Sequence, residues 1–211
     1  QCIEFEPKFA CLTDSAAAQA LALLLKNANS TTEVISLPDE IISLCVSSEV
    51  DIVVAAMVGA VGLQYVIASA KAGKRILLAN KESLVMSGAL LMRTTVEDGA
   101  TILPVDSEHN AILQALPDGY LPGMQPPGGV GSIILTASGG PFLTLPLSEF
   151  SAISPEQAVK HPKWSMGAKI SVDSATMMNK VLEVLEAHYL FSMPASKIET
   201  VIHPQSLVHS M

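Results

Sequence analysis

Short apolar segments alternate with helical patterns along the first half of this 211-residue chain, and that alternation restricts the fold more than any other feature. The segments at residues 50–57 and 75–79 are rich in Val, Ile, Leu and Ala, as parallel strands covered on both faces usually are. Further strands are predicted at residues 8–12, 33–37, 100–105 and 132–137, and helices at residues 15–26, 38–46, 63–72 and 83–97. Such alternation predicts an α/β fold with a mostly parallel sheet and right-handed crossovers. Ligands of these sheets gather beyond the carboxyl ends of the strands.

The pattern changes at residues 116–131, a stretch rich in proline and glycine that predicts a loop or linker. Beyond it the sequence predicts one strand, a Pro- and Ser-rich stretch and a single long helix at residues 174–190. We therefore expect the second half of the chain to form a second domain.

The composition argues against several classes of protein. Hydrophobic residues make up 49% and charged residues 15%, which is typical of a folded globular chain. A net charge of -8 argues against nucleic acid or an anionic membrane as a partner, since both need a basic surface. The 3 cysteines form no C-x-x-C pattern, which indicates reduced thiols in the cytoplasm and no disulfide framework. No apolar run approaches the roughly 20 residues that span a membrane, and no signal peptide is recognisable.

Two carboxylates one residue apart, Asp106 and Glu108, follow the apolar run at residues 101–105. In an extended backbone, alternation would place both on the same side of the strand end. Two acids this close repel each other and resist desolvation, and a hard divalent cation is the usual compensation. Oxygen ligands alone favour Mg²⁺ or Mn²⁺ over zinc. Ordinary surface acids remain the alternative unless a third ligand lies nearby.

The predicted helix at residues 174–190 carries an amide, a cation and two acids on one face, with an apolar stripe beside them. The polar face comprises Asn179, Lys180, Glu183 and Glu186, and the stripe comprises Met178, Leu182 and Leu185. The functional interpretation makes Glu183 the third carboxylate ligand and makes Asn179 and Lys180 a phosphate-binding pair. A solvated pair between Lys180 and Glu183 is the alternative. In either case Asp173 and Ser174 are expected to cap this helix.

Three loop segments carry further candidates. The turn at residues 59–62 could present backbone N–H groups to a phosphate or a nicotinamide, or be a plain tight turn. Asn80, Lys81 and Glu82 follow a strand, where they could contact a substrate or a ribose, or simply be solvated. The amides around Ser138 could converge on an anion, although a Gly-Gly turn needs no such role.

The segment at residues 161–167 contains Trp164, which suggests either a lid over a ligand or a core anchor. His109 and His188 are interpreted as structural histidines. The other histidines lie in Pro- or Ser-rich segments that could reach a polar site; these are His161, His203 and His209.

Five blocks of the sequence carry a resemblance to a known family: LLANKESLV, LPVDSEHNAI, LTASGGPF, HPKWSMGAKISVDSATMMNK and VIHPQSLVHSM. Together they closely resemble 1-deoxy-D-xylulose 5-phosphate reductoisomerases, in a form that looks bacterial. The resemblance covers nearly the whole chain. It implies a Rossmann-like NADPH-binding domain at residues 1–105 and an α+β catalytic domain at residues 106–211.

The resemblance also implies the roles of individual residues. The metal-binding and catalytic carboxylates fall on Asp106, Glu108 and Glu183, and further catalytic residues on Lys81, His161 and His209. Substrate-binding residues fall on Ser107, Ser138, His161, Trp164, Ser174, Asn179 and Lys180, the phosphate being taken by Ser138, Ser174, Asn179 and Lys180. Cofactor contacts fall on Ala56, Gly59, Asn80, Lys81, Glu82, Met166 and Gly167, with Trp164 and Met166 matching the lid and the neighbour of the nicotinamide.

The implied reaction is rearrangement of a small-molecule sugar phosphate, 1-deoxy-D-xylulose 5-phosphate, and its reduction by NADPH to 2-C-methyl-D-erythritol 4-phosphate. The implied metal is Mg²⁺ or Mn²⁺, with Co²⁺ also allowed, in a cytoplasmic enzyme that is a homodimer at full length. No nucleic acid or membrane is involved.

The sequence departs from the family in three respects. Val181 replaces a usual Gly and is expected to crowd its helix, and Ala168 replaces a residue that is often basic and so removes a lid contact. The family's N-terminal Gly-rich strand and its C-terminal helical domain have no counterpart in these 211 residues, so this chain is expected to lack both. The expectation is a fragment that keeps the metal and substrate residues but lacks competent cofactor binding. Two alternatives are a metal-free NAD(P)-dependent dehydrogenase, and a non-catalytic module that binds metal and phosphate.

Overall fold

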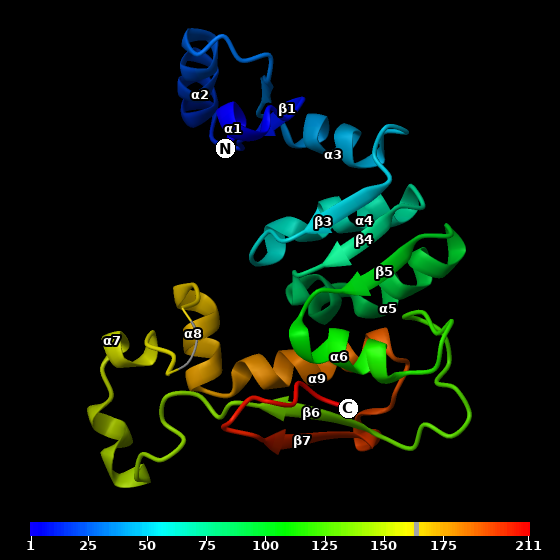
Figure 1. The fold of residues 1–211 in the computed structure, drawn as a ribbon, viewed down its shortest axis with the longest axis vertical. Coiled ribbons are helices and arrows are strands. Elements are labelled where there is room, and N and C mark those ends of the chain that lie inside the picture. Colours follow the sequence, from blue (N-terminus) through cyan, green and yellow to red (C-terminus); the bar gives the residue numbers. More distant parts are fainter. Residues whose placement is uncertain (163–164) are drawn as a thin grey trace.

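The computed structural model describes residues 1–162 and 165–211, and Figure 1 shows how the elements are arranged. Three parallel sheets are present in this part of the chain, with strand orders β1-β2, β3-β4-β5 and β6-β7. Strands and helices alternate up to α6, so the predicted α/β fold with parallel pairing is confirmed. No helix in the described residues is long and apolar enough to cross a membrane.

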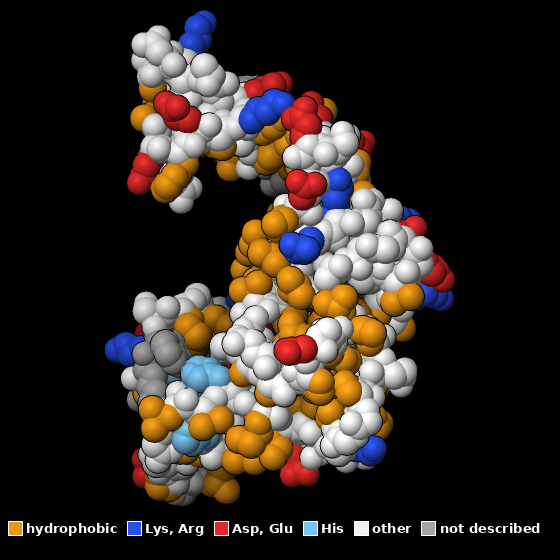
Figure 2. Space-filling view, turned by 45° about the vertical axis from the view of Figure 1, so that its right-hand side comes forward, with side chains coloured by type: hydrophobic (Ala, Val, Ile, Leu, Met, Phe, Trp, Pro, Cys, Tyr) orange, Lys and Arg blue, Asp and Glu red, His pale blue; other side chains and the backbone are white. Residues whose placement is uncertain are grey.

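The first unit contains α1 (Cys2–Phe5), β1 (Phe9–Cys11), α2 (Ser15–Asn27), β2 (Glu33–Ile35) and α3 (Pro38–Val46). β1 pairs with β2 in parallel, and the carboxylate of Asp14 caps α2 by accepting from the backbone N–H of Ala17 at 2.7 Å. The unit stands apart from the other sheets in Figure 1, and Figure 2 shows it projecting above a hollow.

The central sheet contains β3 (Ile52–Ala55), β4 (Arg75–Leu78) and β5 (Thr101–Pro104), connected by α4 (Leu63–Lys71) and α5 (Lys81–Glu97). A short 3-10 turn, η1 (Ala60–Gly62), precedes α4. Helix α5 begins at Lys81, two residues earlier than predicted, because the side chain of Asn80 accepts from the backbone N–H of Ser83 at 3.0 Å and acts as the N-cap.

The sheet edges beside β1 and β3 are open within the described residues, since β1 pairs only with β2 and β3 only with β4. Val54 is 64% exposed and Ile52 49% exposed. The prediction that this strand is covered on both faces was therefore wrong for β3. It holds for β4, where Ile76 and Leu78 are fully buried between two paired neighbours.

The second half begins with α6 (Ser107–Ala115), and a segment without helix or strand follows it at residues 116–132, as the prolines and glycines predicted. The last sheet joins β6 (Ile133–Ala137) to β7 (Ile198–Ile202), a strand that was not predicted. Between them lie η2 (Leu147–Ala152), α7 (Pro155–Ala158), α8 (Ala168–Ala175), α9 (Met178–Leu190) and η3 (Ala195–Lys197).

The single helix predicted at residues 174–190 is wrong, because α8 and α9 are separate helices. Met177 lies between them with a φ of 60°, in the left-handed region that a continuing helix cannot use. Asp173 and Ser174 consequently lie in the last turns of α8 and cap nothing. The break lets α9 leave α8 at an angle and run beneath α6 (Figure 1).

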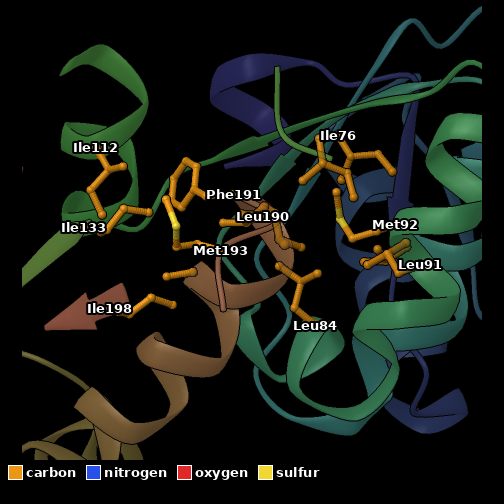
Figure 3. Close-up of a cluster of buried hydrophobic side chains, with 14 of the residues drawn as sticks. Ile76, Leu84, Leu91, Met92, Ile112, Ile133, Leu190, Phe191, Met193 and Ile198 are labelled. Carbon is orange, nitrogen blue, oxygen red and sulfur yellow. The ribbon is translucent and has the colours of Figure 1, made fainter. Parts of the chain in front are cut away.

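One hydrophobic core runs through both halves of the molecule (Figure 3). Leu84 and Leu91 of α5 face Leu190 of α9, and all three are fully buried. Burying a Leu side chain contributes about 1.5–3 kcal/mol. Close packing continues at Gly88, where a Cβ would lie 2.2 Å from the ring of Tyr189 on α9. This contact holds α9 rigidly against the helix that begins at Asn80 and Lys81.

Candidate active site

Three carboxylates from distant parts of the chain converge beside β5. Asp106 is the N-cap of α6, Glu108 lies in its first turn, and Glu183 comes from α9. One ligand atom from each lies within 4.8 Å of the other two. Such a set of oxygen donors fits a hard divalent cation. The third carboxylate that the sequence analysis required therefore lies at the predicted place.

The extended-strand argument for Asp106 and Glu108 was wrong. Helix α6 begins at Ser107, so the two carboxylates meet across the first turn of a helix and not by alternation along a strand. The reason is that the chain turns immediately after Pro104, where the amide of Asn110 donates to the carbonyl oxygen of Pro104 at 3.0 Å. Glu108 then lies near the positive end of the helix dipole, which stabilises its charge.

Two buried lysines compensate these acids. Lys81 Nζ lies 2.5 Å from Asp106 Oδ2 and 3.4 Å from Glu183 Oε1. Lys180 Nζ lies 3.1 Å from Glu108 Oε1 and also contacts Glu183 Oε2. Lys81 and Lys180 are 8% and 6% exposed. A solvated Lys180–Glu183 pair, the alternative left open by the sequence, is therefore not what the structure shows.

Burial and neighbouring charges shift the pKa values of this group. Burial, with the charge of Asp106 added, raises the pKa of Glu183 to about 7. Burial opposes ionisation of Asp106 as well, but Lys81 outweighs it and lowers the pKa of that carboxyl. Burial would lower the pKa of Lys81, and the carboxylates of Asp106 and Glu183 reverse the effect and raise it. The carboxyl groups of Asp106 and Glu183 thus have pKa values shifted in opposite directions.

Two further ionisable residues, His109 and Glu186, lie beside the carboxylates. His109 and Glu186 are both fully buried, and His109 Nδ1 lies 3.4 Å from Glu186 Oε2. His109 was interpreted as merely structural and Glu186 as part of a polar face. Their spacing carried a signal, because each lies three residues after a proposed ligand, Asp106 or Glu183.

A cleft of about 380 Å³ opens from the carboxylates. Its walls include five predicted substrate-binding residues, the predicted catalytic residues Lys81 and His209, and the predicted cofactor contact Met166; the five are Ser107, Ser138, His161, Ser174 and Asn179. His161 Nε2 lies 3.1 Å from Ser138 Oγ, and His209 Nδ1 lies 3.3 Å from Ser107 Oγ. Both histidines thus reach the polar site. Trp164 lies outside the described residues.

The four residues predicted to bind phosphate gather at one end of this cleft, where Ser138, Ser174, Asn179 and Lys180 line a recess of about 40 Å³. The turn after β6 brings them together, because Gly140 has a φ of +71° and lies so close to α8 that a Cβ would be 2.6 Å from the carbonyl oxygen of Ser174. Only glycine fits this position. Asn179 Nδ2 donates to Glu183 Oε1 at 2.5 Å and so links the recess to the carboxylates.

A second cavity of about 390 Å³ lies beyond the carboxyl ends of β3 and β4. Ala56, Lys81, Glu82 and Gly167 line it, and Lys81 and Asn179 line both cavities. Lys169 bridges its two walls, since its Nζ lies 2.7 Å from Glu82 Oε1 and 2.8 Å from Asp173 Oδ2. The sequence analysis missed this bridge, although the i,i+4 spacing of Lys169 and Asp173 is a signal for it.

Asn80 and Gly59 shape this second cavity without lining it. Asn80 Nδ2 donates to the carbonyl oxygens of Met57 and Gly59, the latter at 3.0 Å, while Asn80 itself is 2% exposed. Gly59 has a φ of +79° and open space around it. Asn80 thus fixes the loop that leads from β3 into η1.

Two histidines and two substitutions lie away from the reacting groups. His203 Nε2 accepts from the backbone N–H of Leu207 at 3.1 Å, and His188 Nδ1 lies 2.7 Å from the carbonyl oxygen of Met193. Val181 is 52% exposed, so it does not crowd α9 as was expected. Ala168 is the first residue of α8 and lines the second cavity.

Comparison with known proteins gives this geometry a family. One family model, described as 1-deoxy-D-xylulose 5-phosphate reductoisomerase, matches residues 1–88, and a second, described as the C-terminal domain of the same enzyme, matches residues 102–191. Curated relatives with that name align over the whole chain, at 54% identity in Aromatoleum aromaticum and 53% in Dechloromonas aromatica. This chain belongs to the 1-deoxy-D-xylulose 5-phosphate reductoisomerase family. It spans about half the length of these relatives, 52% in each case.

Solved reductoisomerases have the same fold. A crystal structure of DOX-P reductoisomerase in complex with NADPH, fosmidomycin and magnesium superimposes with a TM-score of 0.91 at 47% identity, covering 99% of this chain and 52% of that one. The enzyme from Zymomonas mobilis in complex with NADPH gives a TM-score of 0.82 at 43% identity, covering 97% of this chain and 50% of that one. The Rossmann-like character expected for residues 1–105 agrees with these reductoisomerase neighbours.

Proposed function

We propose that this chain supplies the metal-binding and substrate-binding residues for the NADPH-dependent conversion of 1-deoxy-D-xylulose 5-phosphate to 2-C-methyl-D-erythritol 4-phosphate. The observation that carries the proposal is the convergence of Asp106, Glu108 and Glu183 in a cleft that adjoins the serine, amide and lysine recess. The cleft thus offers neighbouring cation and anion sites to one small molecule.

The carboxylates fit Mg²⁺ because they present only oxygen atoms. Mn²⁺ and Co²⁺ fit the same donors. A cation held there would act as a Lewis acid toward neighbouring oxygens of the sugar. The carboxylates orient that cation, and Lys81 adds a positive charge at the same end of the cleft.

The phosphate of the substrate is assigned to the recess formed by Ser138, Ser174, Asn179 and Lys180. Hydroxyl and amide donors with one ammonium group suit a phosphate dianion. His161 orients the hydroxyl of Ser138 in the recess, and His209 contacts the hydroxyl of Ser107 beside the carboxylates. Met166 and the lid predicted around Trp164 would exclude water from the reaction.

NADPH is assigned to the second cavity, with Ala56, Glu82 and Gly167 as its lining and Gly59 and Asn80 as its support. NADPH would supply the hydride. Lys81 and Asn179 line both cavities, so the reduced carbon can lie between the two ligands. A further parallel strand between the open edges of β1 and β3 would complete the nucleotide-binding sheet.

The proposal extends to the domains, the compartment and the oligomeric state of the whole enzyme. Residues 1–105 form the cofactor-binding domain and residues 106–211 the catalytic domain. The whole enzyme is a cytoplasmic homodimer of isoprenoid biosynthesis. The three cysteines are free, which suits a reducing compartment.

Titration of the chain with 1-deoxy-D-xylulose 5-phosphate, with and without Mg²⁺, tests the function. We expect heat of binding only with Mg²⁺, its loss in Asp106→Asn, and no effect of the control Asp118→Asn, at an exposed acid. Binding that survives EDTA would instead support a metal-free dehydrogenase.

We expect no oxidation of NADPH by the chain alone, because the sheet is open beside β1 and β3. Full-rate turnover would refute that expectation.

A further inference from the structure

The buried pair of His109 and Glu186 has no place in the proposed function so far. Both side chains are fully buried, yet neither Glu186 oxygen nor His109 Nδ1 has a hydrogen-bond partner within the described residues. An unpaired buried polar group costs about 1–3 kcal/mol. A pair retained at that cost calls for a physical explanation.

The chemistry of His109 settles which way its hydrogens point. His109 Nε2 lies 2.8 Å from the backbone carbonyl oxygen of Glu183, and a carbonyl only accepts, so Nε2 carries a hydrogen. His109 Nδ1 then faces Glu186 Oε2 at 3.4 Å. His109 therefore joins the two helices by one hydrogen bond, from Nε2 to the Glu183 carbonyl oxygen, and by a 3.4 Å contact between Nδ1 and Glu186 Oε2.

The contact between His109 and Glu186 joins the two helices that hold the proposed metal ligands. His109 follows Glu108 on α6, and Glu186 lies one turn after Glu183 on α9. The pair of His109 and Glu186 is therefore a second contact between α6 and α9, next to the contact made by the carboxylates. The ring of His109 stacks on Phe191 with centroids 6.3 Å apart and planes 13° apart, which fixes its orientation. His109 Nδ1 also lies 3.9 Å from Asp106 Oδ2.

We propose that Glu186 is a positioning residue, which acts through His109 to hold α6 and α9 at the separation that the three carboxylates need to share one cation. The inference rests on the metal site of the proposed function. Glu186 itself donates no ligand. Partners in the layer behind metal ligands typically contribute 10–100-fold to metal affinity.

Mn²⁺ binding by the chain, followed by the electron paramagnetic resonance signal of free Mn²⁺, tests the proposal. We expect Glu186→Met, which keeps the length but removes the carboxyl group that contacts His109, to weaken binding about 10–100-fold. Glu186→Gln can still donate to His109 Nδ1, and it should stay within about threefold of wild type. Leu185→Met, at a 40% exposed position on the same helix, is the control.

Two results would overturn the proposal. If Glu186→Gln loses as much affinity as Asp106→Asn, then Glu186 is a ligand; if Glu186→Met binds as tightly as wild type, then it positions nothing. Should the wild-type chain bind no Mn²⁺, the metal site fails but the pair can still be examined by nitrogen-15 spectra of the histidine rings. There we expect a hydrogen on Nε2 of His109 and a displaced Nδ1 resonance in Glu186→Met alone. An unchanged Nδ1 resonance would refute the contact between Glu186 and His109.

Discussion

Removal of the charge of Lys180 offers the sharpest test of the electrostatics of this site. Lys180 is 6% exposed and contacts Glu108 and Glu183. At the 3.1 Å that separates Lys180 Nζ from Glu108 Oε1, one ion pair corresponds to about 5 kcal/mol at an effective dielectric constant of about 20. Breaking a buried pair by removing one partner typically costs about 3–5 kcal/mol. We expect Lys180→Met to lose that much free energy of unfolding without metal at pH 8.

The loss should depend on pH in a defined direction. Burial raises the pKa of Glu183 to about 7 from 4.5, so the folded state binds more protons than the unfolded state in this window, and its stability falls as pH rises from 4.5 to 7. Without Lys180 the folded pKa of Glu183 rises further, and the fall continues above pH 7. The variant should therefore lose about 1 kcal/mol more at pH 8 than at pH 5.5.

Urea unfolding followed by circular dichroism, in EDTA at pH 5.5 and pH 8, measures this difference. Other groups that titrate in both proteins cancel when the variant is compared with wild type. Lys197→Met, at an exposed lysine, is the matched control and should change little. The double variant Lys180→Met/Glu183→Gln should recover part of the loss. Equal destabilisation at the two pH values would refute the reasoning.

Three further predictions concern packing and metal. Gly140→Ala should lose about 1–3 kcal/mol of unfolding free energy and weaken binding of inorganic phosphate, because its Cβ meets the Ser174 carbonyl. Gly128→Ala is the control, since open space surrounds Gly128. If Gly140→Ala bound phosphate as tightly as wild type, the assignment of the recess would be contradicted. Gly88→Ala should lose about 1–3 kcal/mol in urea unfolding through the ring of Tyr189, and Tyr189→Leu in the same chain should recover part of it unless the clash is relieved elsewhere. Mg²⁺ at 100 times its Kd should add about 2.7 kcal/mol to the unfolding free energy, reversibly with EDTA, and a calorimetric melting temperature that does not respond would argue against the site.

Local patterns predicted the elements better than their ends. The α/β alternation, the parallel pairing and the loop after α6 follow from apolar periodicity and from glycine and proline, which act over a few residues. The break at Met177 was not predictable, because methionine has no preference for the left-handed backbone that it adopts there. The exposed β3 was missed for a related reason: a β-branched run indicates a strand but not whether neighbours cover it.

The carboxylates of the candidate site could be predicted from the sequence, but their contacts with the buried lysines and with His109 could not. Carboxylates at Asp106 and Glu108 with a third acid on a later helix could be paired by chemistry alone. The counter-charges could not, because Lys81 and Glu183 are 102 residues apart and meet only in the folded chain. His109 was undervalued for the same reason, since a lone histidine shows its partner only when α6 and α9 are side by side.

In helix α9 charged side chains are buried and several apolar side chains are exposed, which is the reverse of the usual arrangement. Its lysine and its two glutamates at positions 180, 183 and 186 are buried, whereas Met178, Val181 and Leu185 face solvent. A mutational scan of this helix should accordingly tolerate serine or glutamine at the three apolar positions and penalise leucine at the charged ones. Any ranking of variants that equates hydrophobicity with importance would order this helix backwards.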